Sequence, residues 1–439
     1  MGEIKQRKHL CADALFDTIH SGFEKINEHR TREPKISLPD ALMSGFAMFS
    51  LKDASLLAFE ERRNDQNIKN IYHITNVPSD TQMREILDKI EPDTISPLFA
   101  DIFREFQRGK LLENYVFLNG CYLLSIDGCG YFSSHDVHCE SCLEKKNKKT
   151  GEITYQHQML GAVIVHPDIK EVIPLTPEPI IKQDGNSKND CERNASKRFF
   201  EKLRKQHPHL PLIVVEDGLA SNAPHIHELN NHNMHYILGA KEGDHKSLFL
   251  HVEAAEKDGL TTEIVNENEK GEIINRLRFI NQVPLNESNS DTMVNFLEYW
   301  EVKNDRTLHF SWVTDITITL ENANQIMRGG RARWKIENET FNTLKNQGYH
   351  FEHNYGHGKQ NLSVVFAFLM MLAFLVDQIQ QHADHLFQAV LAKCGTKRSL
   401  WENMRSMFRL LEFDSMEKIF KAMLYGYKIQ GFTVLDSHT

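Results

Sequence analysis

The stretch Tyr-Leu-Leu-Ser-Ile-Asp (122–127) is an apolar run that ends in a carboxylate, and it decides the fold assignment. A second apolar run, Leu-Pro-Leu-Ile-Val-Val-Glu-Asp (210–217), ends in the same way. Short, fully apolar runs of this kind are typical of strands buried inside a parallel sheet. Asp127 and Asp217 are therefore expected at strand ends, exposed at a sheet edge but held rigidly by the sheet.

A third acidic residue, Glu337, lies in Arg-Ala-Arg-Trp-Lys-Ile-Glu-Asn-Glu (331–339), which we interpret as the start of a helix. Two strand-end carboxylates and one helix carboxylate can converge on divalent metal, and such oxygen ligands suit Mg²⁺ or Mn²⁺. Two ions about 3.5–4 Å apart can hold both the attacking and the leaving oxygen of a phosphoryl transfer. The pattern predicts a two-metal catalytic site at Asp127, Asp217 and Glu337.

The segments around these runs predict the fold class. Apolar and β-branched runs indicate strands at 115–126, 153–157, 160–166 and 171–175, then a helix at 191–206, a strand at 212–216, a short helix at 225–231 and a strand at 234–239. A meander followed by helix, strand, helix and strand is the order of a ribonuclease-H-like mixed sheet. We therefore predict an α/β fold, with the catalytic domain formed by residues 113–246 and 317–360.

Different patterns flank this domain. Residues 1–112 are predicted to be all-helical, and so is the region 361–439. Residues 247–316 are predicted to form a β-rich insertion, with strands at 248–253, 261–265, 273–282, 296–302 and 308–314.

The composition narrows the class further. The chain has 439 residues, which suggests two to four structural units. Its most apolar segment, 364–376, is shorter than the roughly 20 residues of a membrane span, so we expect a buried core helix and no membrane partner. Seven cysteines without an export signal indicate reduced thiols and a cytoplasmic protein. The net charge of −9 argues mildly against nucleic acid, but the basic segments 193–205 and 325–360 can bind phosphate.

Four motifs carry a family resemblance: Ser-Ile-Asp-Gly (125–128), Val-Glu-Asp-Gly (215–218), Val-Thr-Asp-Ile (313–316) and the stretch from Arg333 to Lys345. Over about 120–360 the chain resembles a DDE transposase of IS4-like bacterial insertion sequences. A β insertion before the third carboxylate is also typical of that family.

The family's signature reads Tyr, two residues, Arg, three residues, Glu, six residues, Lys. Arg333 and Glu337 keep the Arg-to-Glu spacing, whereas Gly330 stands at the Tyr position and Lys345 lies seven residues after Glu337. One extra residue rotates a helical side chain by about 100°. Arg333 and Glu337, at i and i+4, share a helix face, and the planar guanidinium can bind a phosphate there.

The resemblance implies an enzyme that cleaves double-stranded DNA at terminal inverted repeats and joins the 3′-OH ends to target DNA, as a homodimer in a synaptic complex. Helices within 1–112 would bind the ends, and the C-terminal helices would support dimerisation. The DNA-phosphate ligands would be Arg331, Arg333, Lys345 and Lys359. Trp300 and Trp312, in the insertion, are candidates for stacking on a flipped base, or are core residues of the β block.

Two other functions stay open. One is a ribonuclease-H-fold nuclease that cuts without joining, and the other is an inactive, transposase-derived DNA-binding protein. Glu339 is the alternative to Glu337. The remaining acidic residues are expected to be solvated, structural or outside the metal shell: Asp136, Asp184, Asp190, Glu216 and Asp315.

Cys139-Glu-Ser-Cys142 is a CxxC motif and a candidate half of a zinc site. The partners available are His135, His138, Cys129, His157 and Cys191. No second CxxC or HxxxH follows at regular spacing, so the sequence favours unligated thiols and keeps zinc as the alternative.

Overall fold

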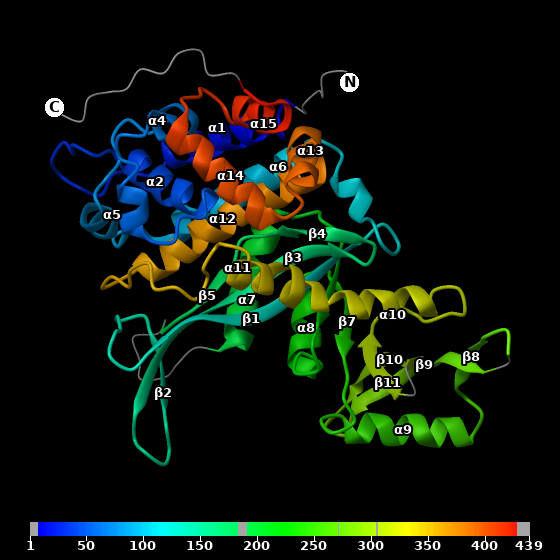
Figure 1. Ribbon diagram of the computed structural model, residues 1–439. Coiled ribbons are helices and arrows are strands. Elements are labelled where there is room, and N and C mark those ends of the chain that lie inside the picture. The colour runs from blue at the N-terminus through cyan, green and yellow to red at the C-terminus, as the bar shows by residue number, and fades with distance from the viewer. Residues whose placement is uncertain (1–7, 183–190, 271, 304–305, 428–439) are drawn as a thin grey trace, which may run out of the picture.

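The structure is a computed structural model that describes residues 8–182, 191–270, 272–303 and 306–427. A mixed sheet runs through the molecule, and helices from both ends of the chain cover one of its faces (Figure 1). Helices α7 (Glu192–Gln206) and α8 (Ala223–Asn231) lie on the other face.

The centre of the sheet has the strand order β4-β3-β1-β6-β7. Neighbours β4, β3 and β1 are antiparallel, whereas β6 runs parallel to β1, and β7 runs parallel to β6. This is the order of a ribonuclease-H-like sheet, so the predicted fold class is confirmed. The strands of this part are β1 (Tyr122–Ser134), β2 (Leu143–Lys146), β3 (Ile153–His166), β4 (Ile169–Pro174), β5 (Glu178–Ile180), β6 (Leu212–Glu216) and β7 (His235–Gly239).

The predicted β-rich insertion continues the same sheet, because β11 pairs antiparallel with β7. Its elements are α9 (Lys246–Lys257), β8 (Thr262–Glu267), β9 (Ile273–Asn286), β10 (Asn289–Lys303) and β11 (Arg306–Thr314). The strand predicted at 248–253 is wrong. Leu248 and Val252 lie four residues apart and are both buried on one face of the helix α9.

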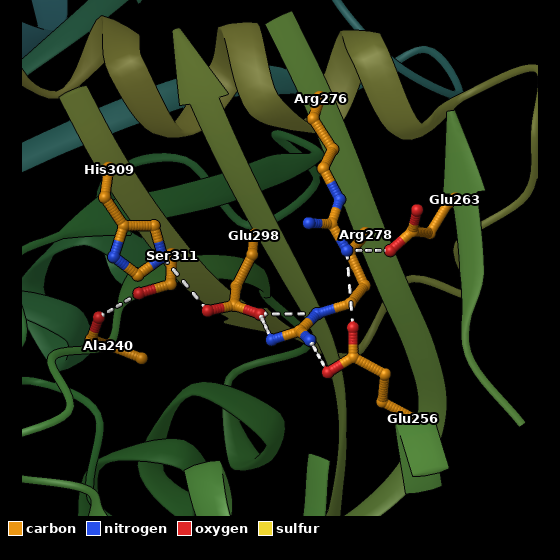
Figure 2. Close-up of polar contacts among 8 residues, drawn as sticks. All are labelled: Ala240, Glu256, Glu263, Arg276, Arg278, Glu298, His309 and Ser311. Atoms are coloured by element: carbon orange, nitrogen blue, oxygen red, sulfur yellow. Dashed lines mark hydrogen bonds and ion pairs between the residues drawn. The ribbon is translucent and has the colours of Figure 1, made fainter. Parts of the chain in front are cut away.

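A buried ion pair ties the added strands to one another. Arg278 of β9 donates through Nε to Glu298 of β10 at 2.9 Å, and His309 of β11 lies 3.0 Å from the same carboxylate (Figure 2). Arg278 also contacts Glu256 of α9, so the helix is held against the strands it covers.

The N- and C-terminal helices form one layer (Figure 1). Asn67 donates to the carbonyls of Phe408 and Leu411, and Asp13 accepts the N–H of Met416 at 2.6 Å. The described helices of the two regions predicted separately, 1–112 and 361–439, are therefore packed together. The helices are α1 (Ala12–Phe23), α2 (Leu38–Ser50), α3 (Leu56–Glu60), α4 (Gln66–Tyr72), α5 (Asp80–Leu87), α6 (Ser96–Arg108), α12 (Leu362–Ala383), α13 (His385–Cys394), α14 (Lys397–Leu410) and α15 (Met416–Tyr425).

Helix α12 contains the most apolar segment of the chain. By length and composition it is the one helix of the described residues that could cross a membrane, but 94% of its apolar window is buried inside the protein. It packs on α2, α6 and β4, as the core helix predicted from the sequence would.

The third carboxylate lies in the middle one of three consecutive helical segments: α10 (Ala323–Ala332), a π-helix (Ile336–Phe341) and α11 (Asn342–Asn346). The prediction that a helix starts near Arg331 is wrong, because α10 begins eight residues earlier, at Ala323. Gly330, at the family's Tyr position, lies against Trp312, and a Cβ there would overlap the indole ring. The glycine lets α10 pack directly on the sheet.

Candidate active site

Asp127 lies inside β1 rather than at its end. The parallel pairing of β1 with β6 stops at Ser125, but β3 continues to pair along β1 and places Gly161 opposite Asp127. The prediction of a strand end at Asp127 is therefore wrong, because the apolar run ends where β6 ends and not where β1 ends. Asp127 still reaches the edge where β6 stops, on backbone that is fixed by β3.

Asp217 is the first residue after β6, as predicted. Its Oδ1 accepts the N–H of Leu219 at 2.9 Å, which fixes the turn that follows the strand. Gly239 lies against the same turn, and a Cβ there would be 3.3 Å from the carbonyl carbon of Asp217. Two chain segments thus meet closely at this carboxylate, and the glycine permits it.

Glu337 reaches Asp127 through Arg333. The Nη1 of Arg333 lies 2.7 Å from Oε1 of Glu337 and 3.6 Å from Oδ2 of Asp127. The hydroxyl of Ser125 donates to the carbonyl of Arg333 at 2.9 Å and fastens this segment to β1. Strand and π-helix therefore present two carboxylates to one guanidinium.

The charge on Asp127 is poorly compensated. Burial raises the pKa of Asp127 to about 7, because the lowering effect of Arg333 is outweighed by desolvation and by the neighbouring Glu337. A carboxylate in this position gains more from a further cation than a solvated one does.

A cleft beside β1 and β6 is lined by Asp127, Asp217 and a further acidic residue, Glu192. Glu192 is the first residue of α7, and its carboxylate lies where a Cβ of Gly128 would be. Burial raises the pKa of Glu192, and the charges of Asp217 and Glu216 raise it further. The sequence analysis missed Glu192, because it directly precedes the basic segment 193–205.

Glu216 lines the same cleft and has a structural partner. Its Oε2 lies 2.6 Å from Nε2 of His225, and both residues are buried. Burial alone would lower the pKa of His225, but the adjacent Glu216 carboxylate raises it. This pair connects the end of β6 to α8 beneath the cleft.

A second cleft shares Asp217 with the first and is lined by Arg333, Trp334 and Lys241 among others. Trp334 is 47% exposed, and the guanidinium of Arg333 lies 4.4 Å from the centre of its ring. Cation and aromatic side chain thus stand together beside the carboxylates. The sequence analysis did not single out Trp334, because exposure cannot be read from a helical pattern.

Of the other predicted phosphate ligands, Arg331 and Lys345 form ion pairs within the protein, and Lys359 is exposed. Arg331 lies 2.8 Å from Glu301, Lys345 lies 2.8 Å from Glu352, and Lys359 is exposed. Their contacts with DNA stay predictions.

The two tryptophans of the added strands pack against neighbouring side chains, Trp312 buried and Trp300 partly buried. Trp312 is 5% exposed and packs between Gly330 and Phe310. The centres of the Trp312 and Phe310 rings are 6.0 Å apart. Trp300 is stacked on His309, with ring centres 4.9 Å apart, and also contacts two arginines. Trp312 is a core residue, so it offers no free face to a base.

The remaining candidates lie outside the acidic cleft. Asp315 accepts the N–H of Tyr236 and contacts His235, a structural role, and Asp136 is exposed in a loop. Asp184 and Asp190 lie outside the described residues. Cys139 and Cys142 belong to a separate cluster with His157 and His357.

The donor set of the cleft fits hard divalent cations. Asp127, Asp217 and Glu192 line the cleft with carboxylate oxygens, which Mg²⁺ and Mn²⁺ prefer, and Glu337 adds a fourth carboxylate beside Arg333. Asp127, Asp217 and Glu337 are the residues that would hold the ions.

The chain was compared with known protein families, sequences and structures. Residues 172–375 match the family model described as the transposase DDE domain, a range that contains Asp217 and Glu337 and begins after Asp127. A cryo-EM structure of the piggyBac transposase synaptic complex with hairpin DNA aligns with 100% of this chain and 90% of its own, at 11% identity and a TM-score of 0.43. No curated protein sequence matches the chain. Residues 172–375 therefore match a transposase DDE domain, as the resemblance predicted, and the IS4-like subgroup stays a prediction.

Proposed function

Because this chain carries a transposase DDE domain, we propose that it is a DNA transposase that cleaves at the terminal inverted repeats of its element and joins the 3′-OH ends to target DNA. One observation carries the proposal: Asp127 and Asp217 line one cleft, and Glu337 reaches Asp127 through Arg333. The three carboxylates come from the strands and the helical segment predicted to bear them.

The roles of the side chains follow from their contacts. When bound, two Mg²⁺ or Mn²⁺ ions would activate the attacking oxygen and stabilise the leaving oxygen of the phosphoryl transfer. Arg333 would orient the scissile phosphate, because its planar fork can bind two phosphate oxygens at once. Trp334 offers an exposed ring next to Arg333, on which a base near the cleaved bond could stack.

The partner is double-stranded DNA, at the element ends and at the target. Lys241 lines the cleft that holds Arg333, and Arg193 lines the acidic cleft, so cationic side chains flank the carboxylates on both sides of Asp217. The helical layer would bind the ends and support a homodimer in the synaptic complex. The proposed location is the bacterial cytoplasm, on the nucleoid.

The decisive experiment uses the purified full chain with labelled DNA that carries the sequences flanking its gene. We expect cleavage at inverted repeats and joining into a target plasmid with Mg²⁺ or Mn²⁺, binding without cleavage with Ca²⁺, and no cleavage with EDTA. Undiminished cleavage in EDTA would reject metal-dependent chemistry. Cleavage without joined product would instead identify a nuclease, and binding without cleavage in every metal would identify an inactive DNA-binding protein.

A further inference from the structure

Four side chains outside the acidic cleft converge on one point: Cys139, Cys142, His157 and His357. Within the described part of the chain, this is the only group of three or more His, Cys, Asp or Glu residues whose ligand atoms all lie within 4.8 Å of one another. The sequence offered the two cysteines as a candidate half-site, while favouring unligated thiols, and included His157 among the available partners. It missed His357, which is 215 residues from Cys142 along the chain.

Four of the six distances between the ligand atoms are close to those of a tetrahedral metal site. The sulfurs of Cys139 and Cys142 are 3.9 Å apart, and Nε2 of His157 lies 3.3 Å and 3.5 Å from them. The Nε2 of His357 lies 3.2 Å from the sulfur of Cys142. Around Zn²⁺, with bonds of about 2.3 Å to sulfur and 2.0–2.1 Å to nitrogen, neighbouring ligands are roughly 3.4–3.8 Å apart.

Three of the four side chains are buried, and Cys139 is partly buried. Cys142 is 1% exposed, His157 0% and His357 6%. The Nδ1 atoms of both histidines have no hydrogen-bond partner among the described residues, so both rings are directed by their Nε2 contacts with sulfur. Neutral thiols are weak hydrogen-bonding groups, and they explain poorly why two buried imidazoles turn toward them.

We propose that Cys139, Cys142, His157 and His357 bind a structural Zn²⁺ ion, independently of the function proposed above. Two thiolates and two neutral imidazoles balance the charge of the ion, and the two thiol protons are released on binding. The soft sulfur ligands select zinc over Mg²⁺, and four protein ligands close the coordination shell, as in structural rather than catalytic sites.

The backbone around His357 is shaped for this contact. Gly356 and Gly358 have φ angles of +146° and +69°, conformations that glycine adopts without strain, and they turn the His357 side chain inward. The ring of Phe132 lies 4.3 Å from that of His357 and covers the cluster. Glycines on either side of a ligand are thus part of the site.

The ion would join three distant segments. Cys139 and Cys142 lie between β1 and β2, His157 lies on β3, and His357 lies between α11 and α12. The strands β1 and β3 carry and support Asp127, whereas the segment of His357 follows the helices that carry Glu337. Zinc would therefore fix the segment beyond the third carboxylate to the strands of the first.

The test begins with the metal content of the full chain, purified under reducing conditions with zinc in the growth medium. We expect about one zinc ion per chain. Cys142→Ser and His357→Gln should lose the ion, whereas Cys129→Ser and His135→Gln, neighbours outside the cluster, should keep it. His357→Cys preserves four ligands and should also keep zinc, which guards against a general loss of folding.

Substitution with Co²⁺ provides a second, spectroscopic test of the metal site, which requires neither DNA nor catalytic activity. Exchange of zinc for Co²⁺ should give the visible absorption of a tetrahedral cobalt–thiolate centre in the wild type, and Cys142→Ser should abolish it. A wild-type chain without zinc and without that absorption overturns the proposal. So does equal zinc loss from Cys129→Ser and Cys142→Ser, or a Cys139–Cys142 disulfide in the freshly purified protein. These outcomes are independent of whether the chain transposes DNA.

Discussion

The ammonium group of Lys52 donates to the carboxylate of Asp377 at 2.6 Å, and both side chains are buried although 325 residues separate them. Tyr349 donates to the same carboxylate, so this contact joins the N-terminal helices, α12 and the segment beyond Glu337. Lys52→Met leaves Asp377 buried without its counter-ion and should lower the free energy of unfolding by about 3–5 kcal/mol.

The matched control removes both charges. Lys52→Met with Asp377→Asn keeps an acceptor for Tyr349 and should lose clearly less stability, because no unpaired charge remains. Lys418→Met, which breaks an exposed pair with Asp414, should change little. Denaturant unfolding measures all three variants, and equal losses in the single and double variants would mean that the ion pair is not the cause.

Asp127→Asn, Asp217→Asn and Glu337→Gln should each abolish strand cleavage and leave end binding largely intact. Each variant keeps the shape of the side chain but removes an ionised metal ligand, whereas DNA affinity comes from many phosphate contacts. Cleavage and gel-shift assays on the same preparations separate the two effects. Glu339→Gln is the control and should cleave normally; full activity in Glu337→Gln would transfer the role to Glu339.

Arg333→Lys should reduce cleavage on the order of 100-fold, because lysine keeps the charge but loses the fork that positions the phosphate. Arg328→Lys, at an exposed arginine paired with Asp168, is the matched control and should be silent. Single-turnover cleavage rates and thermal midpoints of the variants distinguish phosphate positioning by Arg333 from a purely structural ion pair. A wild-type rate with unchanged stability in Arg333→Lys would show that Arg333 only makes an ion pair with Glu337.

His207 should make the protein sensitive to mild acid. Burial, together with the nearby Arg104 and Arg204, lowers the pKa of His207 to about 4, whereas an unfolded histidine titrates near 6.5. Between these values the unfolded chain binds the proton and the folded chain does not, so stability falls as the pH drops from about 6.5 to 4. In thermal unfolding across this range, His207→Gln should flatten the pH dependence and the exposed His209→Gln should not. Identical slopes in wild type and His207→Gln would contradict the assignment.

Runs of apolar residues predict those elements whose burial can be read from the run itself. The apolar run before Asp217 is a buried strand, since only burial on both faces makes so continuous a run stable in a sheet. The sequence predicts Asp127 at the end of a strand, whereas β1 continues beyond it. That continuation depends on pairing with β3, which the apolar run does not reveal. At 248–253 the apolar run was too short to separate helix from strand.

The parts of the site that escaped prediction depend on tertiary contacts. Glu192 reaches the cleft because α7 starts next to Gly128, and nothing in the residues around Glu192 encodes that approach. His357 and Cys142 are 215 residues apart along the chain and come into contact only in the folded protein. Spacing rules for metal sites work within one loop or hairpin, and this cluster spans three segments.

The π-helix at Ile336–Phe341 has a consequence for how such chains diverge. Its i to i+5 hydrogen bonds make a wider turn, which can take up one added residue without rotating the helix that follows. Lys345 is one residue further from Glu337 than the family signature requires, yet it lies close enough to the Cys129 thiol to oppose the rise in pKa that burial causes there, two residues from Asp127. A chain can therefore gain one residue beside Glu337 and keep the following side chains on the same helix face, so a sequence search that requires a fixed interval between the glutamate and the lysine would overlook it.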